Sequence, residues 1–125
     1  MITFDILKNE PDVRAFVSGS TIFRDGEPGD LMFVVIEGQV ELRKGNQAIR
    51  SLQPGEVFGE MSIIEDQPRS ADAVAITDCL VAAISQKRFM LLVSQAPFFA
   101  VQMLRLLSER LRNETLMARG INPPS

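Results

Sequence analysis

The sequence predicts a mainly β domain, an antiparallel β-roll or jelly-roll barrel, followed by C-terminal helices of which one is long. Glycine and proline recur through the first part of the chain and separate short segments with β character. From Gln86 onward, apolar side chains are instead spaced as they are in helices. A length of 125 residues suits one domain. We therefore expect a single domain over 1–125, with the β-roll at about 12–85 and the helices at about 86–119.

Strands are expected where short apolar segments lie between turn signals. These segments are 21–24, 31–36, 39–44, 47–52, 70–76 and 78–85. The two-residue links Glu37-Gly38 and Gly45-Asn46 predict tight hairpins, because glycine supplies the positive φ that such turns require. Strands this short and this closely spaced favour a small antiparallel barrel or roll.

Two helices are expected after the strands. The first covers 86–95, and Pro97 opens the second at a position where its missing N–H costs nothing. Along the second helix, apolar residues fall close to heptad spacing, with Glu114 as the one break. They are Ala100, Leu104, Leu107, Leu111 and Ala118. Packing on the protein's own barrel and packing against a second copy explain this spacing equally well.

Other side chains of the long helix receive simpler interpretations. The pair Phe98-Phe99 is expected in the core or at the hinge between the helices. The basic residues share the helix with Glu109 and Glu114, so we interpret them as a solvated face rather than a nucleic-acid site. They are Arg105, Arg110, Arg112 and Arg119.

The composition excludes several kinds of functional site. Histidine is absent, which rules out Ser-His-Asp and Cys-His catalysis as well as histidine-ligated metal or haem sites. Cys79 is the single cysteine, so it cannot form an internal disulfide or a cysteine-rich metal centre, and we expect it to be buried in a strand. The sequence thus predicts no catalytic residue, no metal and no prosthetic cofactor, and we expect the protein not to be an enzyme.

The same sequence bears on the cellular compartment. The longest apolar run, 31–36, is far too short to span a bilayer, and the first residues show no signal peptide. The net charge is −3, which argues against a surface built for phosphate backbones. We expect a cytoplasmic protein that does not associate with membranes.

The segment 54–71 carries the chemistry. Gly59 ends a strand, and 60–64 can form one or two helical turns whose first amides have no internal partner and favour an anion. Arg69 can donate two hydrogen bonds to phosphate oxygens, and Ser70 adds a hydroxyl. Glu60 suits neither task, but a carboxylate can accept a hydrogen bond from a sugar hydroxyl. The set describes a nucleotide with one compact phosphate; the alternative is a structural ion pair between Glu60 and Arg69.

The segments Phe58-Gly59-Glu60-Met61-Ser62 and Pro68-Arg69-Ser70-Ala71 together resemble the phosphate-binding cassette of the cyclic nucleotide-binding domain family. This family includes catabolite-activator-type regulators, regulatory subunits of cyclic-nucleotide-dependent kinases and cyclic-nucleotide-gated channels. The turns at Gly26, Gly38 and Pro54-Gly55 and the two closing helices also fall in the family's order.

The resemblance implies a role for each residue of the cassette. Glu60 would bind the ribose 2′-hydroxyl and Arg69 the cyclic phosphate. Backbone amides from Gly59 to Ser62, together with Ser70, would complete the phosphate cradle. The implied ligand-binding residues are Gly59, Glu60, Met61, Ser62, Arg69 and Ser70.

The resemblance also implies that the long helix meets the base, often from a second subunit. Possible base contacts are Arg112, Asn113 and Thr115. Asp72 is less usual at its position, and a carboxylate facing the pocket would weaken phosphate binding. Strand alternation puts Asp72 on the side of Ser70, opposite Arg69 and Ala71, which leaves its orientation open.

These expectations predict a non-catalytic sensor domain that binds cyclic AMP or cyclic GMP. It would relay binding through its C-terminal helices to an unknown protein effector, or to a second subunit in a homodimer formed by the 97–119 helix. The alternative is a ligand-free β-roll that serves as an interaction or dimerisation module. Because the sequence stops at Ser125, about where related transcription regulators begin their helix-turn-helix domain, no direct DNA binding is expected.

Overall fold

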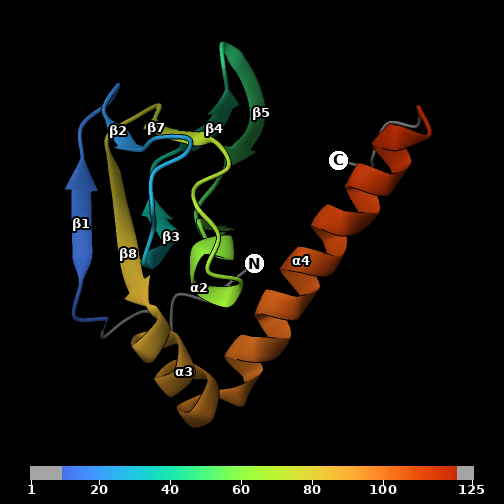
Figure 1. Ribbon diagram of the computed structural model, residues 1–125. Coiled ribbons are helices and arrows are strands. Elements are labelled where there is room, and N and C mark those ends of the chain that lie inside the picture. Colours follow the sequence, from blue (N-terminus) through green and yellow to red (C-terminus); the bar gives the residue numbers. More distant parts are fainter. Residues whose placement is uncertain (1–9, 121–125) are drawn as a thin grey trace.

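The structure is a computed structural model that describes residues 10–120 (Figure 1). Its described strands form two antiparallel four-stranded sheets that make a β-roll. One sheet has the order β1 (Val13–Phe16), β8 (Cys79–Ser85), β3 (Leu31–Glu37) and β6 (Val57–Phe58). The other has the order β2 (Thr21–Phe23), β7 (Asp72–Ala75), β4 (Val40–Lys44) and β5 (Gln47–Leu52). The predicted fold class is confirmed.

The helices follow the predicted order. They are α2 (Met61–Ile64), α3 (Gln86–Gln95) and α4 (Pro97–Ala118). The Ser85 side chain caps α3 by accepting a hydrogen bond from the Arg88 amide at 3.1 Å. The chain bends by 115° between α3 and α4, so α3 closes one end of the roll and α4 rises beside it (Figure 1).

The described residues 10–120 contain no single helix that is long and apolar enough to cross a membrane, although the bent pair of α3 and α4 passes that test when both are taken together. Residues 1–9 and 121–125, on which the expectations about a signal peptide and the chain end rest, lie outside the described residues.

The strands differ from the sequence predictions at two places. β1 was not predicted, because its short segment is exposed on most of its length and lacks a regular alternation. The predicted hairpin at Glu37-Gly38 is wrong, since β3 and β4 belong to different sheets. Gly38 has φ 87°, and a Cβ there would collide with the Asp78 carbonyl, so close backbone approach requires this glycine. The Gly45-Asn46 hairpin is confirmed, with Lys44 paired to Gln47.

β3 is buried on both faces and divides the core into two clusters. Met32 and Val34 pack towards the helices, whereas Phe33 and Val35 pack between the two sheets. Cys79 belongs to the cluster between the sheets, and its predicted burial is confirmed. One face of β3 shares its core cluster with side chains of α2, α3 and α4. Side-chain packing in that cluster therefore fixes the position of the three helices relative to the sheets.

α4 packs on the roll through a different face from the heptad stripe. Its buried side chains are Phe99, Gln102, Met103 and Leu106. In the stripe, Leu104 and Leu111 are 66% and 65% exposed, whereas Ala100 and Leu107 are half-buried. Packing on the protein's own barrel therefore does not account for the stripe.

In two groups of residues that were expected to share one environment, the structure shows different degrees of burial. Phe99 is fully buried and meets the ring of Phe89 edge-on, which confirms the core alternative for Phe99. Phe98 is 56% exposed and is not in the core, but it lies directly after the bend between α3 and α4. Three of the four basic residues are exposed as predicted, namely Arg105, Arg112 and Arg119. The prediction is wrong for Arg110, whose side chain is 14% exposed.

Candidate functional site

A cavity of about 300 Å³ lies where the β2–β7–β4–β5 sheet, the start of α2 and the outer half of α4 meet. All six residues predicted to bind a ligand line it: Gly59, Glu60, Met61, Ser62, Arg69 and Ser70. The remaining walls are formed by Phe23, Leu42, Ile49, Arg50, Pro68, Ala71, Arg110, Glu114 and Met117. The structure thus brings the predicted residues around one cavity, while ligand binding by them remains a prediction.

Arg69 is buried at the inner end of this cavity. Its Nη1 donates a hydrogen bond to Gly59 O at 3.1 Å and its Nη2 donates to Leu31 O at 2.8 Å. Its guanidinium carbon lies 4.1 Å from the centroid of the Phe23 ring. Among residues 10–120, no carboxylate forms an ion pair with it. The side chain is therefore held in position by neutral groups, and its charge is left without a counter-ion.

Two glycines allow this packing. Gly29 lies against Arg69, and a Cβ there would come within 2.5 Å of the guanidinium and 2.7 Å of Ser62 Oγ. Gly59 has φ 75°, and a Cβ there would lie 2.6 Å from Arg69 Nη1. Both backbones must approach the arginine closely, which only residues without a side chain permit.

Burial lowers the pKa of the Arg69 guanidinium from its ordinary value, and the carboxylates of Asp30, Glu27 and Glu60 act in the opposite direction. An arginine remains protonated in spite of such a shift. The desolvation nevertheless means that an anion entering the cavity would stabilise the charge at this site.

The backbone beside Arg69 is fixed by the turn between β2 and β3. The Arg69 amide donates to Glu27 O at 2.9 Å, and the Gly26 amide donates to Arg69 O at 2.8 Å. Ser70 lines the cavity, and its carbonyl accepts a hydrogen bond from Lys44 Nζ at 3.1 Å. The orientation of this segment is therefore set by two main-chain hydrogen bonds and one from the Lys44 side chain, none of which requires a ligand.

Asp72 does not belong to the lining of this cavity. Its Oδ1 accepts a hydrogen bond from the Asp25 amide at 2.7 Å. Asp25 in turn forms an ion pair with Lys44 at 2.9 Å. Asp72 thus stabilises the β2–β3 turn, and its carboxylate does not oppose an anion beside Arg69.

Glu60 forms an ion pair with α4 rather than with Arg69. Its Oε1 accepts a hydrogen bond from Arg110 Nη1 at 2.7 Å, and the two side chains are only 13% and 14% exposed. Arg110 Nη2 also donates to Val57 O. The alternative of a Glu60–Arg69 ion pair is therefore wrong, and the carboxylate predicted to bind ribose is held by the long helix.

Burial lowers the pKa of Arg110, the Glu60 carboxylate raises it and the guanidinium of Arg50 lowers it further. A second arginine thus lies close to Arg110 on the β5 side. Arg50 is paired loosely with Glu114, with 3.9 Å between Nη2 and Oε1. Two guanidinium groups and two carboxylates therefore lie together where α4 meets the cavity, namely Arg50, Arg110, Glu60 and Glu114.

The three predicted base contacts do not line the cavity. Arg112 and Thr115 are exposed, and Thr115 Oγ1 donates to Leu111 O within its own helix at 3.0 Å. Contact of Arg112, Asn113 or Thr115 with a base remains a prediction. In the same part of α4, Glu114 and Met117 line the cavity instead.

Sequence reasoning missed Arg110, although a signal was present. Phe99, Met103 and Leu106 are apolar at helical spacing, and the next position of that series is Arg110. The heptad stripe indicates a different face of the helix, and that interpretation places every arginine of the helix in solvent. The face of α4 that packs on the roll thus continues to Arg110, which pairs with Glu60 in the lining of the cavity.

Within residues 10–120, no cluster of three or more histidine, cysteine, aspartate or glutamate side chains has a geometry that would hold a metal ion. The cavity's chemistry is that of guanidinium groups, carboxylates, one exposed serine hydroxyl and apolar walls.

Comparison with known sequences gives one family. Residues 13–96 match the family described as "Cyclic nucleotide-binding domain". The chain is 35% identical over 108 residues to the cyclic AMP receptor protein of Thermus thermophilus, which covers 82% of this chain and 50% of that protein. It is 40% identical over 87 residues to a cyclic nucleotide-gated potassium channel of Mesorhizobium japonicum, which covers 70% of this chain and 24% of the channel. The chain thus spans half or less of the length of these relatives.

Comparison with solved structures agrees. The catabolite activator protein of Thermus thermophilus superposes with a TM-score of 0.77 at 32% identity, over 86% of this chain and 53% of that one. A protein described with a cyclic-GMP-dependent signalling pathway that regulates bacterial phytopathogenesis also gives a TM-score of 0.77, at 30% identity. That match covers 90% of this chain and 96% of the other.

Proposed function

The chain belongs to the cyclic nucleotide-binding domain family, and we propose that it is a sensor domain that binds cyclic AMP or cyclic GMP in the cavity beside Arg69 and relays binding through α4. The observation that carries this proposal is the buried Arg69 guanidinium without an ion-pair partner among the described residues. A charge held in this way is unfavourable unless an anion reaches it.

The ligand fits the cavity in one direction. The cyclic phosphate lies against Arg69, with the start of α2 and the Ser70 hydroxyl beside it. The ribose 2′-hydroxyl donates to Glu60, as the family's cassette implies. The base then extends towards the apolar walls formed by Leu42 and Ile49, which lie on the side of β4 and β5.

The relay follows from the position of Glu60 between the ligand and α4. Glu60 holds Arg110, so a ribose hydroxyl that reaches Glu60 changes the strength of that ion pair. Gln86 Nε2 donates to Ile63 O at 3.1 Å, which ties the end of α2 to α3. Binding thus favours one position of the helices over another, and an effector or a second subunit responds to that position.

The domain is a regulator in the cytoplasm. It is non-catalytic, because Glu60 and Arg69 do not assemble a nucleophile, a base and an oxyanion site. It forms a homodimer through the exposed stripe of α4 and signals to an unidentified protein effector. The competing function, a ligand-free interaction module, uses the same roll but leaves the charge of Arg69 unexplained.

The test is thermal melting of the protein with cyclic AMP, cyclic GMP and 5′-AMP at millimolar concentration. A ligand at one hundred times its Kd adds about 2.7 kcal/mol of stability, which raises Tm by several degrees. We expect this shift with at least one cyclic nucleotide and a smaller one with 5′-AMP. The absence of a shift with both cyclic nucleotides would favour the ligand-free module.

A further inference from the structure

The side chains of this chain that an oxidant can attack are mainly methionines. The sequence contains no histidine, tryptophan or tyrosine, and its single cysteine, Cys79, is buried in the core between the sheets. Methionine thioethers are therefore the first groups with which a two-electron oxidant such as hydrogen peroxide reacts. We propose that Met61 and Met117 form a modification site, at which oxidation to methionine sulfoxide weakens the binding of the cyclic nucleotide.

Burial divides the methionines of residues 10–120 into two groups. Met32 and Met103 belong to the core cluster beneath the helices and are 0% and 3% exposed. Met61, Met90 and Met117 are 46%, 62% and 64% exposed. Because peroxide must reach the sulfur atom, the three exposed methionines are expected to react first.

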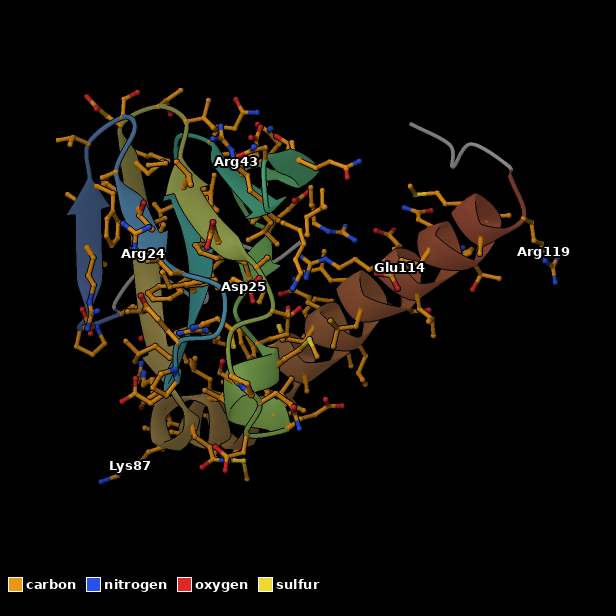
Figure 2. All side chains as sticks on the ribbon, turned by 45° about the horizontal axis from the view of Figure 1, so that its top comes forward. Arg24, Asp25, Arg43, Lys87, Glu114 and Arg119 are labelled. Atoms are coloured by element: carbon orange, nitrogen blue, oxygen red, sulfur yellow. The ribbon has the colours of Figure 1, made fainter. Side chains whose placement is uncertain are left out.

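Two of these three exposed methionines line the ligand cavity. Met61 opens α2, and Met117 lies on α4 just ahead of Arg119, in the part of the helix that extends away from the roll (Figure 2). Met90 does not line the cavity. It lies on α3, which begins beside Lys87 and closes the other end of the roll (Figure 2). The chain thus contains an exposed methionine that serves as an internal control for the other two.

Oxidation changes the cavity wall and leaves the fold in place. One peroxide oxygen is transferred to the sulfur as the O–O bond breaks and the S–O bond forms; the sulfur loses two electrons, the peroxide gains them, and water leaves. The product is a polar sulfoxide in place of an apolar thioether. Met61 and Met117 belong to neither core cluster. Their main-chain carbonyls accept hydrogen bonds from the amides of Glu65 and Gly120, which side-chain oxidation does not alter.

The effect on binding rests on the proposed function, in which the ligand packs along the apolar walls of this cavity. A sulfoxide oxygen that the ligand covers loses its hydrogen bonds to water, and apolar neighbours such as Leu42 and Ile49 replace none of them. Met61 also lines a second cavity of about 290 Å³ between α2 and α4, together with Leu107 and Leu111. Oxidation of Met61 therefore also introduces a polar group where α4 meets α2.

The same geometry predicts that the ligand protects these two residues. A cyclic nucleotide in the cavity covers Met61 and Met117 but leaves Met90 in solvent. The first part of the test treats the protein with hydrogen peroxide, with and without saturating cyclic AMP or cyclic GMP, and follows each methionine by peptide mass spectrometry. Without ligand, the three exposed methionines should react faster than Met32 and Met103. With ligand, the reaction of Met61 and Met117 should slow several-fold, and that of Met90 should not change.

The second part measures Kd by isothermal titration calorimetry after the peroxide has been removed. The oxidised wild type should bind cyclic nucleotide at least about 5-fold more weakly than the untreated protein, the factor that corresponds to one polar group left without a hydrogen bond. In Met61→Leu combined with Met117→Leu, which has no sulfur at either position, Kd should be the same before and after peroxide. Met90→Leu is the matched control and should lose affinity on oxidation as the wild type does.

Three outcomes would overturn the modification site while leaving the sensor function intact. They are an unchanged Kd after full oxidation of Met61 and Met117, an equal loss of affinity in the double variant, and a large fall in the Tm of the ligand-free protein on oxidation, which would place the damage in the core. Binding of no cyclic nucleotide by the untreated protein would overturn the sensor function and this inference with it.

Discussion

The two ends of the cavity are held in different ways. At the inner end, Arg69 is fixed by carbonyls of the roll, by the Phe23 ring and by the backbone of Gly29. At the outer end, Glu60 and Arg50 belong to the roll, but their charged partners, Arg110 and Glu114, belong to α4. The contacts that hold Arg69 at the inner end therefore do not involve α4, whereas the charged pairs of the outer end form only while α4 packs on the roll.

This difference separates affinity from signalling. A preorganised inner end does not have to be ordered when an anion binds, so that end contributes mainly to affinity. The outer end changes with the position of α4, so any contact that a ligand makes there shifts the helix. We therefore expect substitutions at the inner end to alter mainly the binding affinity, and substitutions at the outer end to alter the position of α4 as well.

The largest effect is expected for Arg69→Ala. Loss of the buried charge partner of a phosphate costs roughly 2–5 kcal/mol of binding free energy, which would bring titration of cyclic nucleotides to the limit of detection. The variant also leaves Gly59 O and Leu31 O without a donor, so we expect a lower Tm than in the wild type. Arg43→Ala, whose arginine pairs with Glu41 outside the cavity, is the matched control and should bind normally. An unchanged Kd in Arg69→Ala would exclude this arginine from the site.

The next effect concerns Glu60, the carboxylate that the roll contributes to the outer end. Glu60→Gln should weaken a ribo-cyclic nucleotide more than its 2′-deoxy analogue, because only the ribo form has the 2′-hydroxyl. The wild type should prefer the ribo form by roughly 1.5–3 kcal/mol, the value of a hydrogen bond to a charged group. Competition of the two analogues against a fluorescent cyclic nucleotide measures this preference. If the wild type does not distinguish them, Glu60 serves α4 alone.

A smaller and more local effect is expected for Arg110→Ala. Removing this side chain releases Glu60 and Val57 O from α4, which should cost about 1 kcal/mol of local stability. Hydrogen exchange should become faster in the outer half of α4 and stay unchanged in β3, which lies in the core. The control is Arg112→Ala, an exposed arginine two positions along the same helix. Equal exchange in both variants would mean that the Glu60–Arg110 ion pair does not hold the helix.

The inner end and the neighbouring Glu60 could be predicted from sequence because these parts are local. Gly59, Glu60 and Ser62 lie on one turn, and Arg69 follows after a short loop, so that spacing alone brings a glycine, a carboxylate and a guanidinium together. Apart from β1, the order of strands and helices along the chain was equally accessible, because turn residues and apolar spacing mark it. Residues of one turn are neighbours whatever the rest of the fold, so their sequence alone is enough to predict that they lie together.

The outer end could not be predicted in the same way. Which face of α4 meets the roll depends on how that helix crosses it, and the heptad stripe indicated another face than the one that contains Phe99 and Arg110. The hairpin prediction at Gly38 is wrong for the same reason, since the close approach of Gly38 to the Asp78 carbonyl depends on how the two sheets pack. These contacts join residues far apart in sequence and follow from packing rather than from local pattern.

The smallest effect on stability, and the sharpest test of what α4 does beyond the cavity, is expected for Leu104→Glu combined with Leu111→Glu. Both side chains are about two-thirds exposed, so their loss should change the free energy of unfolding of one subunit by no more than roughly 0.5 kcal/mol each. Leu107, the half-buried member of the stripe, is left intact so that packing on the roll is preserved.

The same two substitutions should have a clear effect on association. In a homodimer formed through the stripe, glutamates at both positions would face their own copies and add to the repulsion already present at Glu114. Sedimentation velocity should then show a dimer for the wild type and a folded monomer for the double variant. Because Glu114 also lines the cavity, the monomer should bind cyclic nucleotide more weakly than the wild type if the second subunit supports the outer end. A wild type that is monomeric at high concentration, with and without cyclic nucleotide, would contradict the dimer and leave the exposed stripe available to a different protein partner.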